Sequence, residues 1–348
     1  MRLIYRLHRW IALGLGALFV LIGLSGSLVV YQSELDRVLN PELLRGSGAA
    51  EPVSAEQALG AVEAVAGDDE AVTFLSLPSA SQDVFRVYIG TPERIFDRLA
   101  TVDPASGELM GIRPVGEGLM RFIHVLHFQL HLGSQGQTVV GLLGLCLLFS
   151  LLTGTLIWHR RRHTGRPAQT IHHGLGLYAG LPLLLVAVSG ILLALPQYTR
   201  PMVETVSPLS GLDLHHHSLV ADNGRDIGLE QAMDLAQATM PDGDVRSIGL
   251  PRGPEGVYRI TVREGEAAGW LPGSGHVVLD RYSGKMLAER HWSDASGGDR
   301  FMTALRAIHG GNFLGGWGKA LVALIGMLPL LLYLTGIRLW LRRRTIGQ

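Results

Sequence analysis

The chain is poor in charge, in lysine and in cysteine. Only 17% of its 348 residues are Asp, Glu, Lys or Arg, against the roughly 25% typical of soluble domains. Only two of the 30 basic residues are lysines. The 30 basic residues are balanced by 30 acidic residues, so the composition lacks the basic excess of a nucleic-acid-binding protein. The single cysteine, Cys146, excludes an internal disulfide and a cysteine-ligated metal cluster. Together these shortages argue against an ordinary soluble enzyme.

The apolar residues are concentrated in four stretches that are each long enough to cross a bilayer, which takes about 20 residues. The stretches are Trp10–Tyr31, Thr138–Trp158, Gly174–Leu195 and Lys319–Trp340. The first is too long for the apolar part of a signal peptide and has no cleavage site after it, so we interpret it as an uncleaved anchor. The sequence therefore predicts an α-helical integral membrane protein with four transmembrane helices.

Arginines mark one side of the membrane. They precede the first span and follow the second and fourth, at Arg2, Arg6, Arg9, Arg160–Arg162, Arg166 and Arg342–Arg344. The positive-inside rule then places both termini and the loop 163–171 in the cytoplasm. The segments 33–116 and 197–300 lie outside, while 1–32, 117–162, 172–196 and 301–348 contain the spans and the helices that lead into them.

The chain contains an internal repeat. In each half a histidine is followed 17 residues later by a Ser-Gly pair, and a second histidine is followed by a glycine after six residues and a Thr-Gly pair after 26. The matched positions are His8 and His172, Ser25 and Ser189, His127 and His309, Gly133 and Gly315, Thr153 and Thr335, and Trp158 and Trp340. Equal spacing without gaps predicts two tandem pseudo-symmetric halves that pack about an axis along the membrane normal.

Each outer segment is predicted to form a small α+β module. Helical patterns at Ser54–Ala66 and Leu229–Thr239 are followed by alternating strand-like runs. The runs are Phe85–Ile89, Leu99–Asp103, Tyr258–Val262 and Val277–Asp280. Ser54 is a suitable N-cap, and Asp103 and Asp280 are interpreted as turn-forming residues. Neither module shows a catalytic constellation.

The repeated histidines are the candidate site. A two-fold axis would bring His8 near His172 at the cytoplasmic face and His127 near His309 at the outer face. Imidazole is a good axial ligand for haem iron, and helix bundles build cofactor sites from facing helices. Ionisable residues at membrane depth are functional candidates by default. The alternative is that these are polar residues at the headgroup level, duplicated without a shared use.

Neighbouring histidines compete for the ligand role. His124, His127 and His131 are spaced i, i+3 and i+7 and are expected to share one helix face. In the second half an arginine and a phenylalanine replace the outer two, which favours the pair of His127 with His309 but leaves His131 as an alternative. His173 competes with His172 in the same way. Arginines near the two pairs are candidates to pair haem propionates, namely Arg6, Arg9, Arg121 and Arg306.

Histidines without repeat partners are assigned a simpler role. His159 and His163 adjoin the cytoplasmic arginines and are interpreted as interface residues. The run His215–His217 follows the third span and is interpreted as a solvated loop rather than a metal site.

These motifs resemble a known family. The segments that carry the resemblance are Leu7-His-Arg-Trp10 with Ser25-Gly26, His127 with Gly133 and Thr153-Gly154, and Ile308-His-Gly-Gly-Asn-Phe-Leu-Gly315 with Thr335-Gly336. Together they resemble the PepSY-associated transmembrane proteins, a group that includes iron-regulated inner-membrane proteins and ferric-siderophore reductases. The resemblance implies four spans, two extracytoplasmic PepSY modules and b-type haem, with two haems expected. It carries ligands over at His8, His127, His172 and His309.

The resemblance also implies an activity. Electrons would cross the bacterial inner membrane to reduce a ferric siderophore in the periplasm, because Fe(II) binds hard oxygen ligands far less tightly than Fe(III) does. Residues expected near the substrate are Trp270, Trp292, Trp317, Arg300 and Arg306. The chain has no Gly-x-Gly-x-x-Gly element, so the electron donor is expected to be quinol or a separate reductase.

Two other functions remain open on sequence grounds. A non-enzymatic anchor would use its PepSY modules to bind or regulate a periplasmic partner such as a peptidase. A transporter would fit the duplicated halves, but the centres of the spans contain no Asp, Glu or Lys for ion coupling. Aromatic residues in mid-span, at Phe19, Phe149, Tyr178 and Tyr333, are interpreted mainly as packing or lipid-facing groups.

Overall fold

The computed structural model describes residues 2–48, 52–79, 82–161, 167–210, 216–219, 224–264 and 273–346. The chain divides into two compact units, each built from both halves of the sequence. The helical unit contains Met1–Gln32, Met120–Pro208 and Arg300–Gln348, and the sheet unit contains Ser33–Leu119 and Leu209–Asp299. The predicted calls at His163, His215 and Trp270 lie outside the described residues.

Four helical segments of the helical unit are long and apolar enough to span a membrane, at Arg2–Val29, Gly133–Arg160, Ile171–Ala194 and Asn312–Arg342. This confirms the four predicted spans. Their elements are α1 (Arg2–Val29), α6 (Gly133–Arg161), α7, η1 and α8 (Pro167–Gly174, Leu175–Ala179 and Gly180–Ala194), and η3, α12 and α13 (Asn312–Leu314, Gly315–Gly326 and Leu328–Ile346). Shorter helices are α5 (Leu119–Gln129), α9 (Pro196–Glu204) and α11 (Gly297–Gly310).

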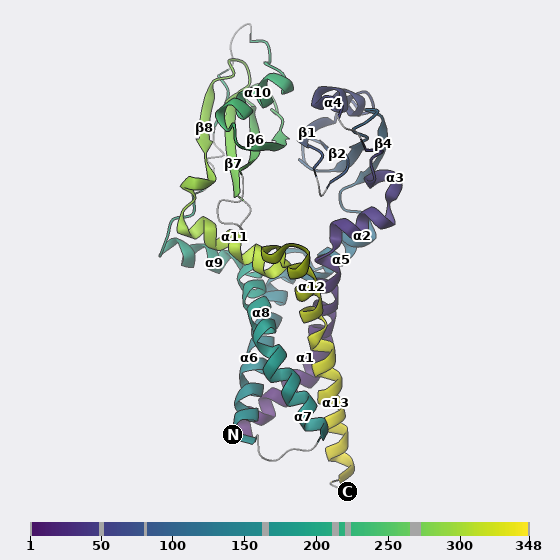
Figure 1. The fold of residues 1–348 in the computed structure, drawn as a ribbon, viewed down its shortest axis with the longest axis vertical. Coiled ribbons are helices and arrows are strands. Elements are labelled where there is room, and N and C mark those ends of the chain that lie inside the picture. Colours follow the sequence, from purple (N-terminus) through teal and green to yellow (C-terminus); the bar gives the residue numbers. More distant parts are fainter. Residues whose placement is uncertain are drawn as a thin grey trace. The chain divides into compact units, whose positions relative to one another are not determined.

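The four spans pack side by side (Figure 1). Helix α1 contacts α6 on one side and α12 and α13 on the other, while α8 contacts both α6 and α12. The two ends of the chain lie at the same end of this bundle, as an even number of spans requires. The helical unit therefore forms a closed ring of four helices rather than a row.

The fourth span is interrupted at Met327, and the interruption is bonded to the first span. Pro329 has no amide hydrogen to donate to the preceding turn, so the helix breaks between α12 and α13. The hydroxyl of Ser27 donates to the carbonyl of Ala323 at 2.7 Å. Gly23 and Gly326 allow the two backbones to approach there, since a Cβ on Gly23 would lie 2.3 Å from the Gly326 carbonyl oxygen.

The sheet unit contains one antiparallel sheet of eight strands. Each half supplies a helix and four strands. The first half supplies α4 (Ala55–Glu63) and β1 to β4 (Ala71–Ser76, Phe85–Gly90, Arg98–Val102 and Leu109–Pro114). The second half supplies α10 (Leu229–Thr239) and β5 to β8 (Asp244–Gly249, Val257–Glu264, Gly273–Asp280 and Met286–Arg290). The strand order is β4-β3-β2-β1-β5-β6-β7-β8. Two short helices, α2 (Gln32–Leu39) and α3 (Pro41–Leu44), precede the first half. The two predicted modules are thus joined into one sheet. Strand β1 pairs with β5, and Leu75 lies opposite Ile248.

The core of the sheet unit lies between one face of the sheet and the helices α4 and α10. Alternate strand residues such as Leu75, Val87 and Ile260 are fully buried against helix residues such as Ala58 and Ala232. Ser54 caps α4 and forms a capping box with Gln57, as its position in the sequence predicts. The other face of the sheet is turned away from these two helices.

The turn-forming roles of Asp103 and Asp280 are confirmed. Asp103 accepts a hydrogen bond from the amide of Ala105 at 2.9 Å, and Asp280 accepts from the amides of Tyr282 and Ser283 at 3.0 and 2.8 Å. Burial by itself raises the pKa of Asp280, but the hydrogen bonds from Ser283 and its neighbours outweigh burial and lower the pKa to about 2.

Candidate functional site

The structure brings His127 and His309 together. Their imidazole centroids are 6.0 Å apart, with 35° between the ring planes. His127 is supplied by α5 and His309 by α11, the helices that lead into the second and fourth spans. Two imidazoles bound on opposite sides of one metal ion, each at about 2.0 Å, also have ring centres roughly 6 Å apart.

Each of these rings is held by a contact that occurs twice in the molecule. The Nδ1 atom of His127 lies 3.0 Å from the carbonyl oxygen of Ile22 and 3.3 Å from the hydroxyl of Ser25. In the other half, Nδ1 of His309 lies 3.0 Å from the carbonyl oxygen of Val186 and 3.3 Å from the hydroxyl of Ser189. The repeat identifies the two serines, but the two carbonyl acceptors carry no sequence signal, because any residue supplies one.

These contacts fix which nitrogen carries the proton. A carbonyl oxygen only accepts hydrogen bonds, so Nδ1 of His127 and of His309 must be the protonated nitrogen. In a neutral ring the Nε2 atom then keeps its lone pair, which is the arrangement found in metal-ligating histidines, whose other nitrogen donates to a backbone carbonyl.

Glycines make room for both rings. A Cβ atom on Gly26 would lie 2.7 Å from Cε1 of His127, and a Cβ on Gly190 would lie 2.7 Å from Cε1 of His309. Real Cβ contacts are essentially never that short, so any other residue would displace the ring. The Ser-Gly pairs of the repeat therefore act together, with the serine bonded to the imidazole and the glycine giving it space.

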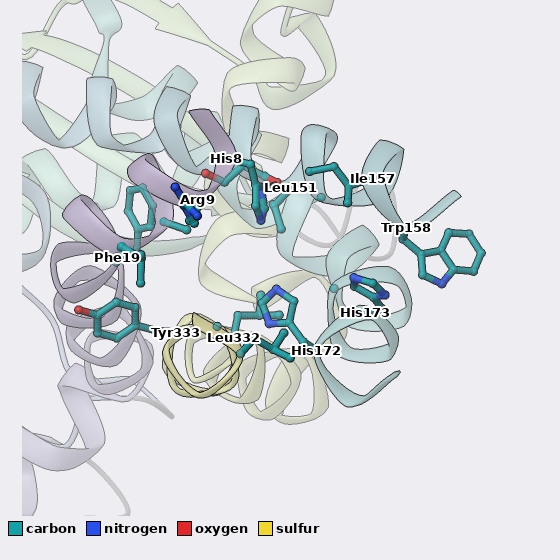
Figure 2. A pocket seen from close by; sticks show the side chains of 18 of the residues that line it. His8, Arg9, Phe19, Leu151, Ile157, Trp158, His172, His173, Leu332 and Tyr333 are labelled. Atoms are coloured by element: carbon teal, nitrogen blue, oxygen red, sulfur yellow. Dashed lines mark hydrogen bonds between the residues drawn. The ribbon is translucent and has the colours of Figure 1, made fainter. Parts of the chain in front are cut away.

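His8 and His172 line one cavity at the other end of the bundle (Figure 2). The cavity has a volume of about 430 Å³, and both rings point into it from α1 and α7. His173, Arg9, Tyr333 and Phe19 also line it. Its wall is mostly apolar, as expected for a site within four membrane-spanning helices.

The second pair is oriented in the same way as the first. Nδ1 of His8 lies 3.1 Å from the carbonyl oxygen of Ser150 and 3.1 Å from the hydroxyl of Thr153. Nδ1 of His172 lies 2.8 Å from the hydroxyl of Thr335, which donates its own hydrogen to the carbonyl of Leu331 at 2.7 Å. Both rings therefore donate through Nδ1, and no described residue forms a hydrogen bond with either Nε2. The threonines come from the Thr-Gly pairs of the repeat.

The two histidine pairs are the candidate ligands among the residues that the structure describes. Among the described residues no group of three or more His, Cys, Asp or Glu side chains could hold a metal ion. Two histidines alone fit a metal whose remaining ligands belong to a cofactor, as in a haem with two axial imidazoles.

The expectation that His124, His127 and His131 share one helix face is wrong for His131. Helix α5 ends at Gln129, and Leu130 and His131 adopt left-handed φ values of 50° and 57°. His131 is exposed, with its Nε2 3.0 Å from the carbonyl oxygen of Phe122. His124 stays on α5, and its buried Nδ1 has no hydrogen-bond partner among the described residues.

The other polar candidates divide between the two ends. His173 lines the cavity with its ring centroid 6.2 Å from that of His172. Arg9 also lines it, with its guanidinium 5.3 Å from the ring centroid of Trp10 and with a buried Nε that lacks a hydrogen-bond partner in the described chain. Arg121, on the same helix as His127, also has a buried Nε without a hydrogen-bond partner among the described residues.

The residues expected near a substrate differ in their exposure to solvent. Trp292 is buried and packs against Gly273, so the interpretation of its indole as a substrate contact is wrong. Trp317, Arg300 and Arg306 are exposed. Of the mid-span aromatic residues, Phe19 is buried and Tyr333 fills the space beside Gly16, as packing residues do; Tyr178 and Phe149 are exposed on the bundle.

Comparison with known sequences gives the family. The sequence profile described as the PepSY-associated TM region matches residues 5–343. The chain belongs to this family. The match covers all four spans and the sheet unit between them, so the PepSY-associated transmembrane architecture accounts for the whole described fold.

A relative is found in Pseudomonas aeruginosa. It is described as "Uncharacterized protein PA4219" and is 29% identical to the chain over 264 residues. The match covers 63% of this chain and 62% of the relative. Its description names no activity.

Proposed function

We propose that the protein is a b-type haem protein of the bacterial inner membrane that carries electrons across the bilayer to a ferric siderophore in the periplasm. The observation that carries this proposal is the doubled histidine geometry. Four imidazoles at repeated positions donate through Nδ1 and keep Nε2 free, and two of them face each other at a ring distance of 6.0 Å. The two matched sets of contacts support a pseudo-two-fold arrangement of the halves.

The residues present fit two haems. His127 and His309 would hold one haem and His8 and His172 the other, with His173 as a neighbour of the second. Arg121 and Arg9 have buried Nε atoms without hydrogen-bond partners among the described residues, and each would suit a propionate. When bound, a haem supplies a one-electron iron centre whose potential depends on its axial ligands, burial and nearby charge.

The chain's own residues set the conditions for that chemistry. The carbonyls of Ile22 and Val186 fix the tautomer of the outer rings, and the threonines Thr153 and Thr335 do the same for the inner rings. Apolar span residues such as Leu13, Leu332 and Leu339 line the cavity beside His8 and His172. Four spans place both termini on one side of the membrane, and the arginines that flank the spans favour the cytoplasm for that side. Quinol in the membrane or a separate reductase would supply the electrons.

The substrate would be a periplasmic Fe(III) chelate. Siderophores hold Fe(III) through hard oxygen ligands, and one electron converts it to Fe(II), which those ligands hold weakly. The metal is then released without breaking the chelator.

An absorbance spectrum tests the proposal. The protein is purified from cells well supplied with haem, and the spectrum is recorded before and after dithionite. A Soret band that shifts on reduction, and returns when an Fe(III) siderophore is added without oxygen, is the expected result. The same siderophore loaded with Ga(III), which is not reduced, is the control and should leave the reduced spectrum unchanged.

A colourless preparation would overturn the proposal. It would favour instead a non-enzymatic anchor whose sheet unit binds a periplasmic protein, and in that case His127→Ala and His309→Ala would leave function intact. The histidine pairs would then serve only to pack the helices.

A further inference from the structure

Helix α9 is a short helix that turns away from the bundle where the third span ends (Figure 1). The last helix of that span, α8, ends at Ala194, and α9 begins with Pro196. A proline disfavours helical geometry in the residue before it, and Leu195 accordingly has φ −117° and ψ 55°. The hydroxyl of Thr199 donates to the carbonyl of Leu192 at 2.7 Å, which ties the new helix to the end of the span.

One side of α9 is packed and the side next to it is an exposed apolar stripe. Thr199 and Val203 are buried. The stripe consists of Tyr198 and Met202 on the helix and Val206 just beyond its end, which are 69%, 54% and 89% exposed. Residues four apart lie above one another on one helix face, so the three side chains form a continuous strip. Such exposed apolar surface marks an interaction site when it is contiguous.

The charged residues of α9 lie on the side opposite this stripe. Arg200 and Glu204 are each two residues from Met202, which is about 200° around an α-helix. Both are exposed, and neither forms an ion pair with another residue that the structure describes. An apolar stripe with charges directly opposite is the pattern of a helix that lies in a membrane interface.

The stripe follows directly on a surface that faces lipid. On α8 the exposed apolar residues include Leu181, Leu185 and Val188, which are spaced four and three residues apart and share one helix face. This helix belongs to a segment long and apolar enough to span a membrane, which ends at Ala194. Tyr198 comes only four residues later. The stripe therefore begins at the level where the span leaves the hydrocarbon.

The equivalent helix of the first half is used differently. The spacing of the repeat matches α9 with α2. On α2, Asp36 accepts a hydrogen bond of 2.6 Å from Arg113, and Arg37 pairs with Asp83 at 3.3 Å, so both charges bind the sheet unit. The matching positions of α9 hold Arg200, which has no such partner in the described chain, and a proline. Helix α2 is thus held by protein contacts that α9 has lost.

We propose that α9 lies in the plane of the membrane surface at the end of the bundle opposite the termini. Its partner is the phospholipid bilayer, with Tyr198, Met202 and Val206 at the boundary between headgroups and acyl chains. The charged side then faces water, and the tyrosine hydroxyl lies at headgroup level, as is usual for interfacial tyrosines. Helix α9 thereby fixes the height of α8, the span that holds the ring of His309. The placement does not depend on the proposed haem function.

Spin labelling tests this placement in the full-length protein. Cys146 is the only cysteine, so Cys146→Ser provides a background in which a single new cysteine carries the label. The protein is placed in nanodiscs of phosphatidylethanolamine and phosphatidylglycerol. Power-saturation EPR then measures collisions of the label with O2, which concentrates in the bilayer, and with a nickel chelate, which stays in water.

Labels on the two sides of α9 should give opposite results. Met202→Cys and Val206→Cys should favour O2, and Arg200→Cys, the matched control on the same helix, should favour the nickel chelate. The O2-to-nickel ratio at Met202 should exceed that at Arg200 at least about threefold, because the apolar face of an interfacial helix enters roughly 5–10 Å into the headgroup and acyl boundary. Leu185→Cys gives the reference value for a site on the span that faces lipid.

Two results would overturn the proposal. Nickel-dominated collisions at Met202 and Val206, as at Arg200, would place the stripe in water. Poor access of both reagents to Met202 and Val206 would show that a protein partner or a second copy of the chain covers the stripe instead of lipid. Either result leaves the haem proposal standing, and a colourless preparation would equally leave the placement of α9 standing.

Discussion

His127 and His309 lie 182 residues apart in the sequence, and their rings lie 6.0 Å apart in the structure. Each ring donates to a carbonyl oxygen of a different span, at Ile22 and at Val186, at the same distance of 3.0 Å. The two carbonyl contacts hold both rings in the same tautomer, with the proton on Nδ1.

The glycines beside the outer pair are predicted to be indispensable. Gly26→Ala and Gly190→Ala each place a methyl group 2.7 Å from a ligand ring, so the ring must move and the outer haem should be lost or occupied poorly. Gly14→Ala is the control, because no atom lies within 4 Å of a Cβ built there. The haem-to-protein ratio measures the effect. A full haem content in Gly26→Ala would contradict the proposed ring position.

Thr335 is predicted to tune the inner haem through His172. Thr335→Val keeps the shape of the side chain but removes the acceptor of the Nδ1 proton, and loss of such a contact typically lowers metal affinity about 10- to 100-fold. Thr239→Val is the matched control, since the Thr239 hydroxyl also bonds back to its own helix, to the carbonyl of Leu235, but belongs to α10 of the sheet unit. Haem titration of the apoprotein compares the two. Equal affinities would show that Thr335 does not orient a ligand.

Arg9 is predicted to raise the reduction potential of the inner haem. A positive charge beside the cavity stabilises the reduced state, so Arg9→Gln should lower the midpoint potential by tens of millivolts. Arg338→Gln removes an exposed arginine one turn from Thr335 and should change the potential much less. Spectroelectrochemical titration measures both. The opposite order of effects would place the inner haem away from Arg9.

The sheet unit is predicted to lose stability in acid. The pKa of Asp280 is about 2 in the folded protein, compared with about 3.9 in an unfolded chain. A depressed pKa stabilises the fold above about pH 4, and this contribution is lost as the pH falls through 2. Asp280→Asn should lower stability at neutral pH by about 2 kcal/mol and flatten the pH dependence between 4 and 2. Thermal unfolding of the wild type and of Asp280→Asn, followed by the β-sheet signal in circular dichroism at pH 7, 4 and 2, compares the two proteins.

The sequence predicts the spans and the histidine pairs well because both depend on simple physics. Twenty apolar residues have few alternatives to a membrane-spanning helix, and a repeat of His, Ser-Gly and Thr-Gly at fixed spacing is visible without a structure. Four strands, β1, β4, β5 and β8, were not predicted, and each pairs with a neighbouring strand through a bulge or register shift. Of these, β1 and β5 join the two halves of the sheet. Their pairing depends on contacts between segments about 170 residues apart, which no local pattern reveals.

His131 shows where a local sequence pattern misleads. Its i+7 spacing from His124 suggests a shared face, but the helix ends at Gln129 and removes it from that face.

The most direct test of the central claim is the absorbance spectrum of the single variants His309→Ala and His8→Ala beside the wild type. The account predicts that each variant loses about half of the haem, with a different redox component missing from each titration. His291→Ala, in the sheet unit, should keep the full spectrum. Unchanged spectra in both variants would contradict the assignment of the repeated histidines as ligands.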